Sequence, residues 1–270
     1  MSNLILSIIN FVAYGVLAVY FWQAQVRGAG DTSSRGVIGH LVLIPLAMHG
    51  YLLVQGIFSG EGLDLGLLQS LSLIIWLTLV IYWLARFFYP IGGMQTLLLP
   101  IAAVTVVLPQ LFRTDHLLTN TNLFVFKAHI TVAMLAYSLF TIATLHAVLI
   151  FQVEKRLHHA TLPRVLRSLP PLMTMETLLF RMIGIGFVLL TLTLVSGVAF
   201  SEEIFGKPWQ LSHKILFGFI SWGVYGVLLC GHQFYGWRGR VAVRWTVGGF
   251  VLLLLAYLGS KFVLEVLLHR

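Results

Sequence analysis

Residues 125–151, VFKAHITVAMLAYSLFTIATLHAVLIF, decide the fold class because they form one long apolar run. The run contains a single charged side chain, Lys127. It exceeds the ~20 residues that an α-helix needs to cross the hydrocarbon of a bilayer, so its ends should project beyond it. Further runs of spanning length lie near 4–22, 37–58, 66–85, 92–110, 180–200, 212–230 and 243–266. The sequence thus predicts an all-α, polytopic integral membrane helix bundle with about eight transmembrane helices, as a single transmembrane domain over 1–270.

The composition excludes a soluble protein. Of the 270 residues, 59% are hydrophobic and 10% are charged, whereas a soluble domain carries about 25% charged residues. The net charge of +8 does not indicate nucleic-acid binding, because the basic residues are scattered singly through the connections. Cys230 is the only cysteine, which excludes an intrachain disulfide and covalent attachment of haem through CxxCH. We expect membrane lipid as a partner and no nucleic acid.

Lysine and arginine concentrate in alternate connections between the predicted spans, which sets an orientation. The positive-inside rule places these basic connections in the cytoplasm, so both termini are predicted on the outer, periplasmic side. The longest connection, roughly 152–179, contains Pro163, Pro170 and Pro171. We expect it to lie along the cytoplasmic interface as short amphipathic pieces. The basic residues assigned to the cytoplasmic side are Arg27, Arg35, Arg86, Lys155, Arg156, Arg164, Arg167, Arg181, Arg238, Arg240 and Arg244.

Histidines are the chemically informative residues, because an ionisable side chain inside a membrane span is rare and usually functional. The predicted topology sorts them into two levels. His129 and His146 are 17 residues apart, or ~25 Å along a helix, so they belong to two separate candidate sites. The outer level holds His129, His213 and His269, and the cytoplasmic level holds His40, His146 and His232. Spacing alone does not choose between haem, another metal and structural hydrogen bonding.

Several common site motifs are absent from the sequence. No HExxH zinc motif, glycine-rich phosphate loop or carboxylate pair within a span occurs. We therefore predict no catalytic residue. A transporter, with histidines and Arg86 along its path, is weakly supported without an intramembrane carboxylate. A b-type cytochrome would need two histidines facing each other at one depth, for which His40 with His146 or His232 are candidates.

Three stretches of the chain carry a family resemblance. They are FKAHITVAMLAYSLFTIATLHAVLIFQVEKRL at 126–157, LLFRMIGIGFVLLTLTLVSG at 178–197 and SHKILFGFISWGVYGVLLCGHQFYGWRGRVAVRWTVGGFVLLLLAYLGS at 212–260. In order and spacing they resemble the cytochrome c assembly family, which includes CcsA-like and HemX-like haem-handling membrane proteins. The C-terminal half, 112–270, carries the resemblance, and the N-terminal helices match only in hydropathy.

The resemblance implies a haem-binding or haem-handling protein of the bacterial inner (cytoplasmic) membrane, related to cytochrome c biogenesis. It implies haem b as the cofactor, with His129 and His269 as candidate axial ligands of the haem iron on the outer face. The cofactor-binding residues are then expected among His129, His269, His213, His40, His146 and His232. Other cytochrome c biogenesis or membrane subunits are the expected protein partners.

The chain departs from that family at its tryptophan-rich WWD signature. The corresponding stretch is LSHKILF, 211–217, in which Lys214 matches and His213 stands where the family has proline. Trp222, farther along the same predicted helix, is the matched tryptophan. This departure resembles the divergent HemX-like branch and implies a haem-handling or accessory role rather than an enzyme. The alternative is a membrane accessory or regulatory subunit that keeps the fold without haem transfer.

Overall fold

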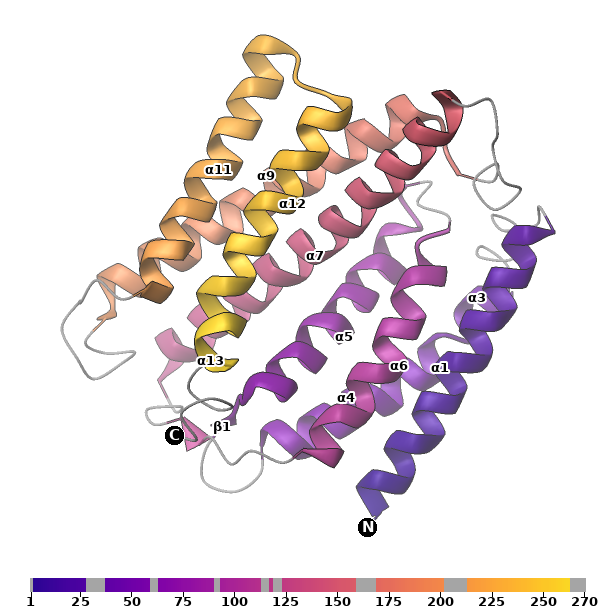
Figure 1. Ribbon diagram of the computed structural model, residues 1–270. Coiled ribbons are helices and arrows are strands. Elements are labelled where there is room, and N and C mark those ends of the chain that lie inside the picture. Colours follow the sequence, from indigo (N-terminus) through magenta and orange to yellow (C-terminus); the bar gives the residue numbers. More distant parts are fainter. Residues whose placement is uncertain are drawn as a thin grey trace.

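The computed structural model describes residues 2–27, 37–58, 63–89, 93–112, 117–118, 123–158, 169–201 and 213–262. The chain is an all-α bundle, which confirms the predicted fold class (Figure 1). Its first half contains α1 (Ser2–Val26), α3 (Val37–His40), α4 (Leu43–Ile57), α5 (Leu67–Ala85) and α6 (Gln95–Leu111). Its second half contains α7 (Phe124–His158), α9 (Leu172–Ala199), α11 (His213–Tyr235) and α12 (Gly239–Leu254), which continues through the π-helical turn η1 (Leu255–Gly259) into α13 (Ser260–Phe262).

Within the described ranges, six helices are long and apolar enough to cross a membrane, and α4 and α6 are shorter apolar helices. Both shorter helices contain proline. Pro45 lies in the first turn of α4, and Pro100 and Pro109 lie inside α6. Proline has no backbone N–H to donate and fits poorly within a helix interior, although neighbouring helices can compensate in a membrane. Together, the six long helices and the two shorter ones make eight apolar helices among the described residues, in agreement with the predicted number of about eight.

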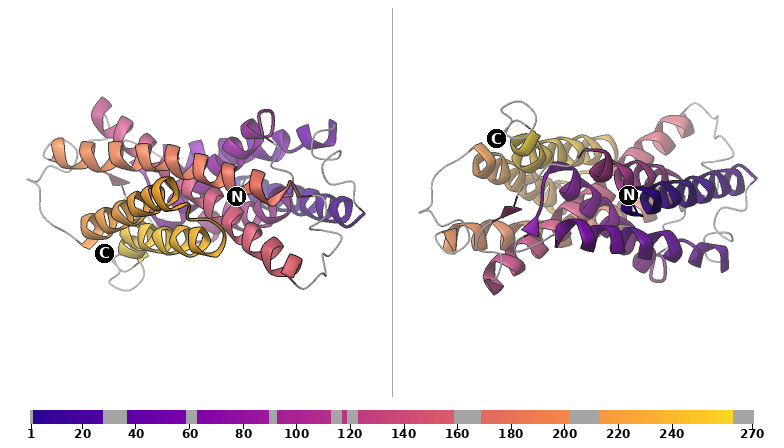
Figure 2. Two further views of the ribbon diagram at one scale, coloured as in Figure 1. Left: turned by 90° about the horizontal axis from the view of Figure 1, so that it is seen from above. Right: turned by 90° about the horizontal axis from the view of Figure 1, so that it is seen from below.

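Two helix groups lie side by side, α1, α4, α5 and α6 in one and α7, α9, α11 and α12 in the other (Figures 1 and 2). Helices α5 and α7 join the groups through short polar side chains. Thr78 Oγ1 lies 2.7 Å from the Ile74 carbonyl of its own helix and 3.2 Å from the Ser138 carbonyl across the interface. Ser138 Oγ likewise lies 2.7 Å from the Met134 carbonyl of its own helix and 3.1 Å from the Ile74 carbonyl across the interface. Small side chains that hydrogen-bond across helices are typical of membrane bundles, where apolar contact alone does not favour association.

Long helices alternate in direction, which gives the bundle two distinct ends (Figure 1). The ladder end contains the antiparallel pair β1 (Leu63–Asp64) and β2 (Leu117–Leu118), the starts of α1, α7 and α11, and α13. The turn end contains the connection between α11 and α12, the end of α7 and the start of α9. Most of the described basic residues belong to the turn end, the end assigned to the cytoplasm by the positive-inside rule.

The long connection differs from its prediction. Helix α7 continues to His158 and α9 begins at Leu172, so both ends of the predicted interfacial segment 152–179 belong to these helices. Hydropathy placed the α9 span at 180 because Glu176 interrupts the apolar run. In the fold, that carboxylate accepts a hydrogen bond from the Gly239 backbone N–H at 2.8 Å, which satisfies it within the bundle. Residues 159–168 lie outside the described ranges.

Candidate functional site

His129 occupies an inter-helix position at the ladder end, in the second turn of α7. Its Nδ1 lies 2.8 Å from Oγ of Ser196 on α9. The Ser196 hydroxyl also lies 3.1 Å from the Thr193 carbonyl of its own helix. The contact with Ser196 holds the imidazole ring of His129 in one orientation. A histidine that ligates a metal is oriented in the same way, by a hydrogen bond from its other nitrogen.

A cavity of about 140 Å³ opens beside His129, between α7, α9, α11 and η1. Lys214 and Tyr257 line it together with His129. The Lys214 ammonium lies 5.3 Å from the centre of the Tyr257 ring, and the Lys261 ammonium lies 5.3 Å from the same centre. Both distances fit cation–π contacts. The ladder end therefore combines one oriented imidazole with two positive charges on an aromatic ring.

Helix geometry changes just beside this cavity. The π-helical turn η1 carries Tyr257, whose hydroxyl lies 2.9 Å from Ser70 Oγ on α5. Tyr137 on α7 donates to the Leu253 carbonyl at 2.9 Å, immediately before η1. Single π-helical turns inside α-helices are frequent at functional sites, because they redirect side chains and leave backbone carbonyls to other donors. Here the turn directs the Tyr257 ring toward Lys214.

An apolar groove of about 360 Å³ lies along α9 and α11 next to this cavity. The two hollows share Leu194, Val198 and Phe219 as walls. Trp222 lines the groove, stacks on Phe187 with ring centres 5.4 Å apart, and donates its Nε1–H to Thr191 Oγ1 at 2.8 Å.

Size decides how haem could fit at the ladder end. A cavity of about 140 Å³ is below the about 300–1,000 Å³ typical of sites for drug-sized ligands. The groove between α9 and α11 supplies the additional apolar space, with Val198 and Phe219 as walls of both hollows. The donor set is also suitable, because His129 presents an imidazole lone pair and Lys214 a positive charge. The residues fit haem across the cavity and the groove, and not within the cavity alone.

Of the other predicted outer histidines, His213 begins α11 with an exposed side chain, while its neighbour Lys214 lines the cavity. His269 lies outside the described residues, so its pairing with His129 stays a prediction. The described part of the site brings His129 together with Lys214 and Tyr257.

Cytoplasmic-level histidines lie at the turn end as predicted, but in three separate environments. His40, on the exposed end of α3, accepts from Arg86 Nη2 at 3.0 Å through Nδ1. His146 is buried between α7 and α9, and its Nε2–H donates to the Met175 carbonyl at 3.0 Å. His232 on α11 donates from Nδ1 to the Trp237 carbonyl at 3.0 Å. None of the described contacts joins two of these rings.

His232 borders a further and larger cavity, of about 580 Å³, between α9 and α11. Its ring lies flat on Phe180, with ring centres 3.5 Å apart and an interplanar angle of 11°. Other walls are Met173, Glu176, Thr177, Arg181, Leu229, Cys230, Gln233, Phe234 and Arg238. The described residues contain no group of three histidine, cysteine, aspartate or glutamate side chains that could hold a metal ion.

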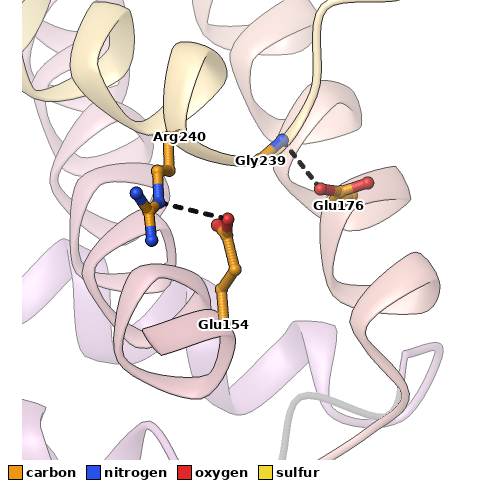
Figure 3. A network of polar contacts seen from close by, with 4 residues as sticks. All are labelled: Glu154, Glu176, Gly239 and Arg240. Carbon is orange, nitrogen blue, oxygen red and sulfur yellow. Dashed lines mark hydrogen bonds and ion pairs between the residues drawn. The ribbon is translucent and has the colours of Figure 1, made fainter. Parts of the chain in front are cut away.

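Two carboxylates stabilise the connection between α11 and α12 (Figure 3). Glu176 on α9 accepts from the Gly239 N–H, and Glu154 on α7 pairs with Arg240 at 3.4 Å. A negative charge at the start of a helix is favourable because unpaired N–H groups and the helix dipole point toward it. Gly236 and Gly239 have φ of +65° and +55°, a left-handed conformation that favours glycine. The roles of these carboxylates and glycines in the connection were not predicted from the sequence, although the Gly-x-x-Gly spacing indicates a tight turn.

His49 has a structural role in the N-terminal helix group. Its side chain is buried among α1, α4 and α5, with Nε2 2.8 Å from Ser72 Oγ and Nδ1 3.4 Å from the Tyr14 hydroxyl. Both ring nitrogens face partners in the N-terminal helix group. The histidine thereby connects three helices of that group.

The similarity to known proteins extends over both helix groups and not over the C-terminal half alone. Residues 37–268 match the family described as cytochrome C assembly protein. The chain is 30% identical to the inner membrane protein YpjD of Escherichia coli strain K12, over 97% of this chain and 99% of that protein. It is 27% identical to the cytochrome c biogenesis protein CcsA of Prochlorococcus marinus strain MIT 9515, over 92% of this chain and 89% of that protein. No solved structure matches the chain.

Proposed function

Since this chain belongs to the cytochrome c assembly protein family, we propose that it is a haem-handling protein that holds haem b through His129. The observation that carries this proposal is the hydrogen bond between His129 Nδ1 and Ser196 Oγ. This bond orients the ring of His129, whose Nε2 would hold the haem iron, in the way that a hydrogen bond at the other ring nitrogen orients a ligating histidine. Bound haem supplies an iron centre that accepts such a ligand.

Two further features support the same site. The apolar walls of the groove, including Val198 and Phe219, suit the faces and edges of a flat apolar ring. Lys214 supplies a positive charge at the ladder end for a propionate, since its ammonium lies on the Tyr257 ring rather than in an ion pair with any described carboxylate. We assign the haem to this end and keep His269 as the proposed second axial ligand.

The cytoplasmic-level histidines form the second part of the proposal. His232 is the member of that level that lines the larger cavity. His40 and His146 each contact a different partner and helix pair. His213 is proposed to contribute from the exposed start of α11, beside Lys214, where this chain lacks the family's tryptophan-rich segment.

A second candidate function is an accessory subunit that keeps the fold without haem. One specific observation favours it, because His129 and His146 each form a hydrogen bond between α7 and α9. Such interhelical bonds contribute about 0.6 kcal/mol each in a membrane bundle. In that case the histidines serve helix association, and the partner is a membrane subunit of cytochrome c biogenesis.

A haem titration of the purified protein in mild detergent tests the proposal. We expect a Soret band that saturates with added haem and is strongly weakened in His129→Ala. His49→Gln is the matched control, because His49 lies in the other helix group and is not part of the proposed sites, so the variant should leave the band intact. A band of equal strength in both variants would refute ligation by His129. Absence of the band in the wild-type protein would instead favour the accessory function.

A further inference from the structure

The cavity of about 580 Å³ at the turn end has the composition of a site for an anionic amphiphile. Its volume lies in the range of specific ligand sites. Arg181 on α9 and Arg238 in the α11–α12 connection contribute two guanidinium groups to its wall. Phe180, Leu229 and Phe234 contribute apolar surface to the same wall. We propose that this cavity binds the phosphate headgroup of an anionic membrane phospholipid, with the start of its acyl chains against the apolar wall.

Charge supports this occupant. The ion pairs found among the described residues leave both arginines without a carboxylate partner, and Arg181 instead faces the Tyr89 ring at 5.8 Å. Glu176 also lines the cavity and contributes a negative charge, so the two arginines leave the wall with a net charge of +1. Guanidinium groups match phosphate oxygens because they donate two parallel hydrogen bonds. Basic pockets between transmembrane helices are suited to anionic lipid headgroups for this reason.

The backbone around Arg238 is held in place before any ligand binds. Gly236 and Gly239 bracket Trp237 and Arg238 with left-handed conformations, and Arg238 itself is extended with φ −147° and ψ 177°. Glu176 fixes the far end of this connection through Gly239 N–H, as Figure 3 shows. His232 fixes the near end through the Trp237 carbonyl. Because these contacts already order the backbone around Arg238, binding of a ligand there loses less conformational entropy.

Lipid is favoured over a soluble phosphate compound because of where the cavity lies. It is formed by α9 and α11, whose large apolar side chains, including Val188 and Val227, are exposed along the bundle surface. Both helices are membrane-span candidates. Arginine side chains can bury their apolar stems among such residues while the charged group reaches the headgroup region.

Cys230 provides a direct readout, because it is the only cysteine of the chain, is exposed and lines this cavity. The full-length protein is reconstituted in nanodiscs of phosphatidylcholine alone or of phosphatidylcholine with phosphatidylglycerol. The rate at which a small membrane-permeant maleimide modifies Cys230 is then measured. We expect the anionic lipid to slow the modification severalfold. Arg181→Gln and Arg238→Gln should each reduce this protection of Cys230 by the anionic lipid by about fivefold.

Arg244→Gln is the matched control, because Arg244 is an exposed arginine of α12 that does not line the cavity. It should leave the lipid effect unchanged. Equal modification rates in the two lipid mixtures would overturn the proposal, and so would an equal loss in Arg244→Gln. A third arm adds inorganic phosphate to the phosphatidylcholine nanodiscs. Full protection by phosphate alone would assign the site to a soluble ligand and overturn its assignment to lipid.

Discussion

Nδ1 of His129 on α7 lies 2.8 Å from Oγ of Ser196 on α9. One short hydrogen bond therefore connects two transmembrane helices and also orients the imidazole ring. If His129 ligates haem iron, loss of this bond should change haem binding, whereas in a purely structural role it should change only the stability of the bundle.

Ser196→Ala should weaken haem binding without removing the ligand. Loss of the hydroxyl removes the hydrogen-bond partner of His129 Nδ1 and lets the imidazole ring rotate. Removing such an outer partner of a metal ligand lowers affinity by about 10–100-fold. Haem titration followed at the Soret band measures the change. Ser196→Thr keeps the hydroxyl and should bind nearly as well as the wild-type protein, whereas equal weakening in both variants would contradict the assigned role.

Gly197→Ala should displace the imidazole ring of His129. A Cβ at Gly197 would lie 3.2 Å from Cε1 of His129, so the imidazole must shift by a few tenths of an ångström. We expect a shifted Soret maximum and a reduced haem affinity. Gly184→Ala on the same helix is the matched control, since a Cβ there meets no atom within 4 Å. Identical spectra for the two variants would place the haem away from His129.

Gly239→Ala should destabilise the connection between α11 and α12. Its φ of +55° is left-handed, and adopting it costs a residue with a side chain about 1–2 kcal/mol. Thermal unfolding in detergent should show a lower midpoint. Gly248→Ala, inside α12 and with nothing near its Cβ, should be neutral or stabilising by up to about 1 kcal/mol. A stability loss of the same size at both positions would argue against backbone strain at Gly239.

Accessibility of single cysteines tests the orientation of the bundle. Phe124 at the ladder end and Tyr235 at the turn end are 82% and 80% exposed, which makes them a matched pair. In a Cys230→Ser background, a membrane-impermeant maleimide applied to intact cells whose outer barriers admit it should modify Phe124→Cys. Tyr235→Cys should react only after the cells are permeabilised, because the positive-inside rule places its end in the cytoplasm. Modification of Tyr235→Cys in intact cells, with Phe124→Cys reacting only after permeabilisation, would show that the bundle has the opposite orientation.

Helix number and the two levels of histidine could be predicted from sequence, because hydropathy and span length are local properties of the chain. The start of α9 could not, since the Gly239 N–H that satisfies Glu176 lies 63 positions away. Tertiary contact also decides which residues surround His129. Ser196 and Tyr257 come from other helices, and helix adjacency has no signature in one sequence. For the same reason, the joint position of Arg181 and Arg238 in one cavity was not predicted.

Chemical rescue of His129→Gly tests the central claim most directly. This variant removes the imidazole and leaves space beside Ser196 for a free imidazole molecule. If His129 ligates the haem iron, haem titration of the variant should give a weak Soret band that added imidazole restores toward the wild-type spectrum. The same concentration of imidazole should leave the spectrum of the wild-type protein unchanged. A variant that binds haem like the wild-type protein without imidazole would contradict the claim, as would a variant whose lost band imidazole does not restore while its thermal unfolding remains that of the wild-type protein.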